Sequence, residues 1–113
     1  MIKSYIKNIS FYVPEKIVTN DDLSLMMDTS DEWIFSRTGI SQRHVASKNE
    51  LTSDLAIQAS KKALFSAKTN SSEIDCVILA TTTPDETFPS TATKIQHYFK
   101  MKNIPAFDIQ AVC

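Results

Sequence analysis

Apolar and polar positions along the chain follow two periods, one typical of helices and one typical of strands. From Thr52 to Ala67 the apolar residues recur at helical spacing, which predicts an amphipathic helix. Its apolar stripe consists of Leu55, Ala56, Ala59, Ala63 and Leu64, opposite Ser53, Ser60, Lys61 and Lys68. We expect Thr52 to be the N-cap, and the small residues of the stripe favour close packing against a sheet.

Strand patterns occupy other parts of the chain. Residues Ile2–Val13 alternate between apolar and polar, and Ile40–Ala46 does so more weakly. The run Ile74–Thr83 is continuously apolar and rich in β-branched residues, as in a covered central strand, which we place over Asp75–Thr82. Cys76 lies in this run, so we expect it to be buried and inert. A further short strand is predicted over Pro105–Ile109, with one charged interruption at residue 108.

Three further helices are predicted, over Asn20–Met27, within the run 28–40 and over Ser90–Phe99. Thr19 and Asp22 form a capping pair for the first, and Thr29 with Glu32 fits a capping box for the second. Gly39 allows the second helix to end in a left-handed turn. From residue 52 onwards the order is helix, strand, helix, strand, which indicates an α/β fold.

The pair Trp33 and Arg37 is the first candidate for binding, because residues four apart share a helical face. An indole ring stacks on a nucleotide base and a guanidinium grips a phosphate, so the pair suits a nucleotide. Arg43 and His44 could reach the same ligand. The alternative is that Trp33 is a core anchor beneath a solvated Arg37, and spacing alone favours that alternative.

Composition and charge narrow the classes of function. The 12 basic and 13 acidic residues are interspersed, so no electrostatic footprint for nucleic acid or an anionic membrane exists. No stretch has the pattern of a signal peptide or membrane span. Two cysteines without metal-ligand spacing predict reduced thiols, a cytoplasmic setting and no metal site. The single glycine, where average usage predicts about eight, indicates a fragment or a coding bias.

Cys113 lies just past the predicted strand Pro105–Ile109, four positions after its last residue. A cysteine at that place would meet the N-terminus of a following helix, where the helix dipole favours a thiolate. The alternative is a buried cysteine that packs as a small hydrophobe, and position alone favours it.

Four segments together resemble a known family: NDDL, TSDEWIFSRTGI, ATTTPDETFPST and AFDIQAVC, in that order. The combination resembles the N-terminal third of the β-ketoacyl-acyl carrier protein synthase III family, of the thiolase-like condensing enzymes. The resemblance implies an α/β fold in which residues 1–113 form the N-terminal portion of the first thiolase-like domain of an αβαβα body, a mixed sheet covered by helices, with the second half absent. Strands 75–82 and 105–109 would then expose apolar faces, so the residues alone would be poorly soluble or need a partner chain.

The resemblance also implies a reaction, the initiating condensation of type II fatty-acid synthesis. A short acyl group from acyl-coenzyme A, with acetyl-coenzyme A as the expected primer, would form a thioester on Cys113 before condensing with malonyl-acyl carrier protein. Thr29, Trp33 and Arg37 match positions that hold coenzyme A, and Phe88 matches a residue that lines the acyl pocket of the neighbouring subunit in a homodimer. The resemblance implies no cofactor and no metal.

The chain also departs from the family pattern. The family's catalytic histidine and asparagine come from its second half, and neither His44 nor His97 lies at the histidine position. Two alternatives therefore stand beside the synthase. One is a truncated, non-catalytic product that at most binds coenzyme A or dimerises. The other is a different thiolase-like enzyme that condenses acyl-coenzyme A with another acceptor.

Overall fold

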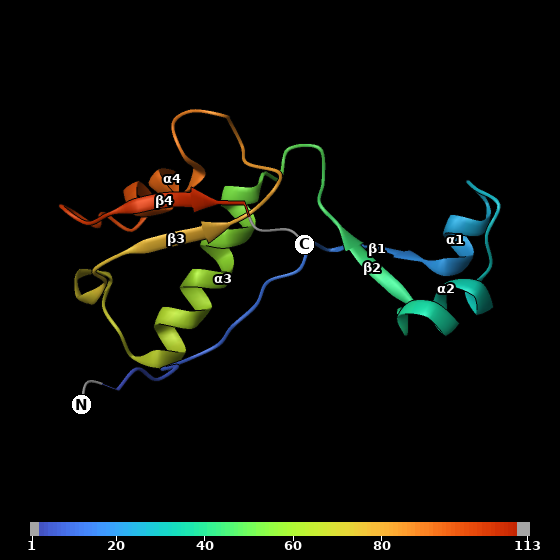
Figure 1. Cartoon of the computed structure of the whole chain (residues 1–113), viewed down its shortest axis with the longest axis horizontal. Coiled ribbons are helices and arrows are strands. Elements are labelled where there is room, and N and C mark those ends of the chain that lie inside the picture. Colours follow the sequence, from blue (N-terminus) through green and yellow to red (C-terminus); the bar gives the residue numbers. More distant parts are fainter. Residues whose placement is uncertain (1–2, 111–113) are drawn as a thin grey trace. The chain divides into compact units, whose positions relative to one another are not determined.

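The computed structural model describes residues 3–110, which divide into two compact units (Figure 1). Unit 2 is the continuous segment Val13–Asn49. Unit 1 contains the described residues on either side of that segment, up to Tyr12 and from Glu50 onwards.

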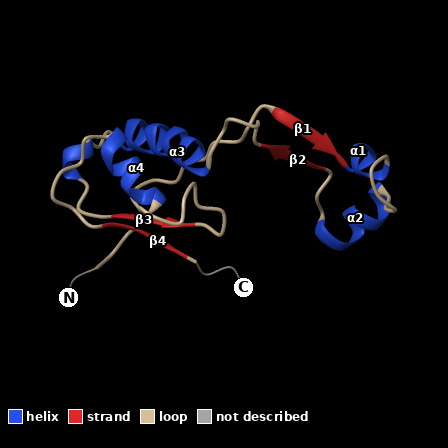
Figure 2. Cartoon of the chain, turned by 90° about the horizontal axis from the view of Figure 1, so that it is seen from above, coloured by secondary structure: helices blue, strands red, loops and turns tan. Residues whose placement is uncertain are grey.

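Unit 1 is an α/β arrangement of two strands, two α-helices and one short 3-10 helix. Its elements are α3 (Thr52–Ala67), η1 (Ser71–Glu73), β3 (Val77–Ala80), α4 (Thr91–Tyr98) and β4 (Ala106–Ile109). Strands β3 and β4 are parallel, with Val77 opposite Ala106 and Ala80 opposite Ile109. Helix α4 is the crossover between them, and both α3 and α4 lie on the same face of the strand pair (Figure 2). The predicted helix, strand, helix, strand order is confirmed.

The small core of unit 1 lies between the two helices and the strands. Ile57 of α3 and Ala92 and Ile95 of α4 are its buried apolar side chains. The opposite face of the strand pair is open, since Ile78, Phe107 and Ile109 are 58%, 42% and 41% exposed. This exposure agrees with the prediction that the strands present an uncovered apolar face.

Unit 2 is an antiparallel strand pair whose connection carries two helices. Its elements are β1 (Lys16–Thr19), α1 (Asn20–Ser24), α2 (Asp31–Thr38) and β2 (Gln42–Val45). Lys16 pairs with Val45 and Thr19 with Gln42. The predicted capping pair is confirmed, because the Thr19 hydroxyl accepts the backbone N–H of Asp22 and the Asp22 carboxylate accepts that of Thr19. Gly39 ends α2 at φ 68°, in the left-handed region as predicted.

The prediction of a strand over Ile2–Val13 is wrong for the described part of that segment. Residues 3–14 have no regular structure, and the first strand is β1 at Lys16–Thr19. Apolar alternation shows which side chains share a face but does not supply the neighbouring strand that a ladder needs. The segment is instead attached to α3, where the Asn8 side-chain amide donates to the Ala63 carbonyl and the Ser66 hydroxyl.

Two predicted helix caps are also wrong. Ser30, not Thr29, caps α2, because its hydroxyl accepts the backbone N–H of Trp33 at 3.1 Å. Thr52 lies inside the first turn of α3, and its N-cap position is occupied by Leu51. The neighbouring Ser30 has the same capping chemistry as a threonine, and its backbone is extended at φ −143° and ψ 161°.

Strand β3 is shorter than predicted, and this changes the environment of Cys76. The strand begins at Val77, so Cys76 precedes it and its thiol is exposed. The prediction that Cys76 is buried is therefore wrong. A covered central strand needs neighbours on both edges, whereas β3 pairs only with β4 among the described residues.

Candidate functional site

Helix α2 carries the candidate nucleotide platform, Trp33 and Arg37. The Arg37 guanidinium carbon lies 4.3 Å from the centre of the Trp33 ring, and Nη1 of Arg37 donates to the Trp33 carbonyl at 3.4 Å. The Trp33 side chain is 55% exposed, which excludes the alternative that it is a core anchor. The predicted pairing on one helical face is confirmed, and the pair presents an aromatic surface and a planar cation together.

The sequence of α2 explains why so short a helix forms there. Ser30 caps its N-terminus, and Asp31 and Glu32 place negative charge in the first turn. Arg37 places positive charge in the last turn, where the helix dipole favours it. Gly39 then adopts the left-handed conformation that ends the helix.

Thr29 lies immediately before the Ser30 cap. Its hydroxyl oxygen is buried and has no hydrogen-bond partner among the described residues. A buried hydroxyl without a partner costs free energy. The Thr29 hydroxyl can therefore gain stability from a new hydrogen bond beside the start of α2.

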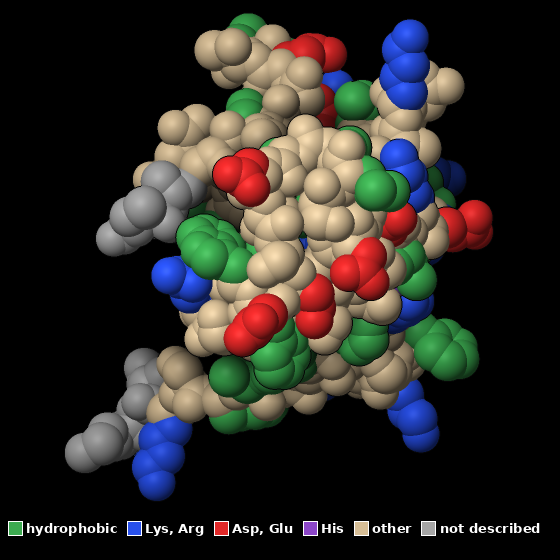
Figure 3. Space-filling model, turned by 90° about the vertical axis from the view of Figure 1, so that its right-hand side faces the viewer, with side chains coloured by type: hydrophobic (Ala, Val, Ile, Leu, Met, Phe, Trp, Pro, Cys, Tyr) green, Lys and Arg blue, Asp and Glu red, His purple; other side chains and the backbone are tan. Residues whose placement is uncertain are grey.

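The surroundings of the platform do not attract anions in general. Acidic and hydrophobic side chains mix on the end of unit 2 that faces the viewer in Figure 3. The exposed acidic residues of α1, α2 and their connection are Asp21, Asp22, Asp28, Asp31 and Glu32. A phosphate bound beside α2 would therefore depend on the Arg37 guanidinium rather than on a broad positive field.

Arg43 and His44 make contacts inside unit 2. Arg43 donates through Nη2 to the Asn20 side-chain oxygen at 2.6 Å and through Nη1 to the Val18 carbonyl at 3.1 Å. Nδ1 of His44 lies 2.6 Å from the Pro14 carbonyl oxygen. The hypothesis that both side chains reach the ligand of Trp33 is not supported.

The second candidate region is the loop between β3 and α4, which carries Phe88. The Phe88 side chain is 88% exposed. The base of the loop is held by Asp85, whose side chain is fully buried. Its carboxylate accepts the backbone N–H of Ser53 at 3.0 Å and lies 3.3 Å from the Lys94 ammonium.

The groups around this loop stabilise the charged forms of both Asp85 and Lys94. Desolvation raises the pKa of Asp85, but the hydrogen bonds from Ser53 and the Lys94 ammonium outweigh it, so the pKa lies below its ordinary value. The pKa of Lys94 is raised, mainly by its hydrogen bond to Glu86 and further by Asp85. Asp85 thus links the loop to the N-terminus of α3 and to α4.

Asp108 of β4 is the counterpart of Asp85 at the start of α4. Its two carboxylate oxygens accept the backbone N–H groups of Thr91 and Ala92, each at 2.7 Å. The Thr91 hydroxyl accepts the backbone N–H of Asp85 at 3.0 Å. Strand β4, helix α4 and the loop are therefore joined at one point. The charged interruption of an apolar strand was the sequence signal that marks Asp108.

Strand β4 leads towards Cys113, the predicted nucleophile, which lies outside the described residues. Beside the strand's end is a hollow of about 410 Å³. Its lining combines the loop with β4: Pro84, Glu86, Thr87, Ser90, Phe107, Asp108 and Gln110. His97 is exposed in the last turn of α4.

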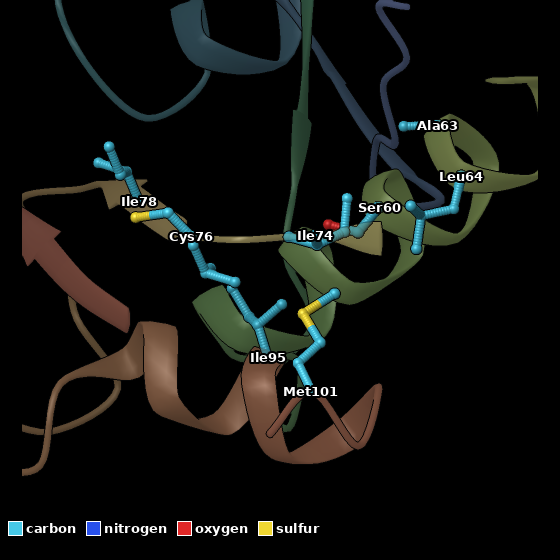
Figure 4. Close-up of a pocket in the computed structure, with 9 residues that line it drawn as sticks. Ser60, Ala63, Leu64, Ile74, Cys76, Ile78, Ile95 and Met101 are labelled. Atoms are coloured by element: carbon cyan, nitrogen blue, oxygen red, sulfur yellow. The ribbon is translucent and has the colours of Figure 1, made fainter. Parts of the chain in front are cut away.

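A separate apolar pocket of about 240 Å³ lies between α3, α4 and the start of β3 (Figure 4). Leu64, Ile95 and Ile78 contribute to its wall, together with the exposed Cys76. None of the predicted site residues lines it. No group of three or more metal-ligating side chains occurs within residues 3–110, and no helix there has the length and apolar character to cross a membrane.

Comparisons with known proteins agree with this arrangement. No family profile matches the chain. A β-ketoacyl-[acyl-carrier-protein] synthase III from Ehrlichia canis (strain Jake) is 58% identical over 113 residues, which are 100% of this chain and 35% of that protein. The solved structure of a synthase III from Thermus thermophilus has a TM-score of 0.88 at 45% identity, covering 96% of this chain and 33% of that one. A priming β-ketosynthase of a polyketide biosynthetic pathway has a TM-score of 0.87 at 31% identity, covering 94% of this chain and 32% of that one.

The helix-covered strand pair and these similarities define the fold as thiolase-like. In sequence and in structure, the chain is similar to proteins named β-ketoacyl-[acyl-carrier-protein] synthase III. It spans about a third of the length of the relatives that it matches, 35% of the first.

Proposed function

We propose that the chain is the front part of an enzyme that starts type II fatty-acid synthesis by condensing a short acyl-coenzyme A with malonyl-acyl carrier protein. The observation that carries this proposal is the 58% identity to a synthase III over all 113 residues. Residues 1–113 are then the N-terminal portion of the first thiolase-like domain. The open face formed by Ile78, Phe107 and Ile109 gives the rest of the fold an apolar surface to cover.

The platform on α2 supports binding of coenzyme A. Trp33 would stack on the adenine ring, and Arg37 would hold a phosphate with the donors that its contact with the ring leaves free. The unpartnered Thr29 hydroxyl, buried at the start of the same helix, would add a hydrogen bond after a small adjustment of its rotamer. Acetyl-coenzyme A is the expected primer.

The proposed chemistry is covalent catalysis by Cys113. Its thiolate would attack the acyl carbonyl of acyl-coenzyme A, and the coenzyme A thiolate would leave and take up a proton. Decarboxylation of malonyl-acyl carrier protein would then supply the carbanion that attacks the acyl-cysteine, returning the Cys113 thiolate and giving 3-oxoacyl-acyl carrier protein. The histidine and asparagine that assist decarboxylation in the family belong to its second half. No cofactor or metal takes part in this scheme.

Phe88 would line the acyl pocket of a neighbouring subunit in a homodimer. Its high exposure, on a loop whose base is fixed by Asp85, supports that role. We further propose a cytoplasmic enzyme whose partners are acyl-coenzyme A and acyl carrier protein, without nucleic acid or membrane.

Intact mass spectrometry before and after incubation with acetyl-coenzyme A tests this proposal. The expected result is the gain of one acetyl group, mapped by peptide analysis to Cys113. A Cys113→Ser variant should gain none, whereas a Cys76→Ser variant should be acetylated as the unsubstituted chain is. Acetylation at Cys76 alone, or at neither cysteine, would contradict the proposed nucleophile.

A second candidate is a different condensing enzyme of the same fold. The similarity to a priming β-ketosynthase of a polyketide pathway supports this second candidate. The acceptor separates the two: release of the acetyl group from the acylated protein by malonyl-acyl carrier protein, and not by malonyl-coenzyme A, supports the fatty-acid synthase. A chain that binds coenzyme A but is never acetylated would instead be a non-catalytic fragment.

A further inference from the structure

We propose that Asn20 is a positioning residue for the nucleotide platform, because its side chain holds both ends of α2 and so fixes the direction in which Trp33 and Arg37 face. This inference rests on the proposed binding of coenzyme A.

The Asn20 side chain forms hydrogen bonds with three other residues of unit 2. It is 1% exposed, and its amide nitrogen donates to the Asp31 carboxylate at 2.7 Å and to the Ile40 carbonyl at 2.7 Å. Its amide oxygen accepts from Nη2 of Arg43 at 2.6 Å. Both side-chain donors and the acceptor are therefore engaged.

The two acceptors of Asn20 lie at opposite ends of the same helix. Asp31 is the first residue of α2, and Ile40 directly follows the Gly39 that ends it. A helix of eight residues is held internally by few hydrogen bonds. One buried amide that bridges its two ends therefore limits both its tilt and its rotation about its own axis.

Arg43 connects this bridge to the strands. Its other guanidinium nitrogen donates to the Val18 carbonyl in β1, while Arg43 itself belongs to β2. The backbone N–H of Asn20 also donates to the Ser41 carbonyl at 3.1 Å. The contacts thus run from the strand pair through Arg43 and Asn20 to α2.

The chemistry of the position is specific to asparagine. A leucine would leave the Asp31 carboxylate, the Ile40 carbonyl and the Arg43 guanidinium without these part-buried hydrogen bonds. An aspartate would set a second carboxylate against Asp31. An apolar residue would suffice if the position served packing alone.

The chain's single tryptophan is Trp33, so intrinsic fluorescence reports on the platform itself. We would titrate the full chain with coenzyme A and, as a control without the nucleotide, with pantetheine. Coenzyme A should quench the fluorescence saturably and pantetheine should not. Asn20→Asp should weaken coenzyme A binding about tenfold or more, the size expected for losing buried hydrogen bonds.

A rescue variant separates positioning from general stability. Adding Asp31→Asn to Asn20→Asp restores a donor–acceptor pair between the two side chains, and should recover part of the lost affinity. Ile57→Ala, which opens a cavity in the core of unit 1, should lower the melting temperature without changing the affinity. If Asn20→Asp fails to fold, Arg43→Lys, which removes the fork to Asn20 and Val18, should weaken binding in the same direction.

Arg37→Gln separates coenzyme A binding by the platform from the positioning role of Asn20. If Arg37→Gln weakens coenzyme A binding while folded Asn20 and Arg43 variants bind as the unsubstituted chain does, the positioning role of Asn20 is overturned and the platform stands. If the unsubstituted chain shows no quenching by coenzyme A, the platform fails and the inference fails with it. A loss of affinity in Asn20→Asp that Ile57→Ala reproduces at equal stability also overturns the inference.

Discussion

The Asp108 carboxylate accepts the backbone N–H of Thr91 at 2.7 Å, so a residue of the last described strand caps the helix that precedes it in the chain. The second oxygen accepts the N–H of Ala92 at the same distance. A side chain that reaches from β4 to α4 makes the position of the strand depend on the start of the helix. Thr91 in turn contacts Asp85 at the base of the loop that carries Phe88, so β4 is connected to this loop through two residues.

Removing this cap should destabilise unit 1. Asp108→Ala leaves two N–H groups at a helix start without their charged acceptor, and we expect a loss of about 2 kcal/mol in the free energy of unfolding, within the range for caps and charged hydrogen bonds. Asp108→Asn should lose less, because one amide oxygen remains. Urea unfolding followed by circular dichroism measures both. The exposed Asp75→Asn provides the matched control, and an equal loss there would contradict the capping role.

The Asp85–Lys94 pair should make stability depend on pH. The pKa of Asp85 is lower in the folded chain than its ordinary value of 3.8, so its contribution is complete above that value and is lost as the pH falls through the folded pKa. The pKa of Lys94 is raised above 10.5, so its contribution is lost as the pH rises through the folded pKa. Unfolding free energies from pH 7 down to pH 2 should fall less steeply for Asp85→Asn than for the unsubstituted chain. Parallel curves for the two proteins would refute the assignment.

The contact of Arg37 with Trp33 should matter more for binding than for stability. A cation–π contact at an exposed site contributes about 0.5–1 kcal/mol, so Arg37→Gln should lower the stability of unit 2 by no more than that. Its affinity for coenzyme A should fall about tenfold, since a charged phosphate contact is lost. Isothermal titration calorimetry and thermal unfolding measure the two effects. Lys48→Gln, another exposed cation of unit 2, should change neither.

The exposure of Cys76 predicts reactivity in the folded chain. A maleimide should modify Cys76 without denaturant, since its thiol is exposed at the edge of the apolar pocket. Peptide mapping distinguishes this label from one on Cys113. Protection of Cys76 until the chain unfolds would show that other residues cover this edge in solution.

Gly39 offers a test of the end of α2. Its φ is 68°, and a Cβ there would meet no atom within 4 Å. Gly39→Ala should therefore cost only conformational energy, about 1–2 kcal/mol for a left-handed residue with a Cβ. Gly39→Asn should cost less, because asparagine tolerates this region best among the other residues. Equal costs for the two substitutions would point to a steric cause instead.

Local patterns in the sequence predicted much of the fold. The bounds of α3 at Thr52 and Ala67 match the amphipathic stripe, and the Trp33–Arg37 pairing follows from their separation by four positions. Both features depend on helical period alone, which neighbours in the sequence determine.

Features that depend on distant residues were not predictable in the same way. The segment 3–14 alternates as a strand would, but no strand pairs with it among the described residues. The exposure of Cys76 depends on what lies beside β3, and the hydrogen bonding of Asn20 depends on the three-dimensional meeting of Asp31, Ile40 and Arg43. A buried asparagine has no periodic signature, so only the folded chain shows its role.

The parallel pairing of β3 with β4 has a consequence for the order of folding. Paired residues such as Val77 and Ala106 are 29 positions apart, and the chain between the two strands contains the eight residues of α4. Short sequence separations cost little loop entropy and favour fast formation. During synthesis from the N-terminus, this strand–helix–strand segment can assemble soon after β4 leaves the ribosome. The parallel pair would then be in place before any residues that are synthesised after it.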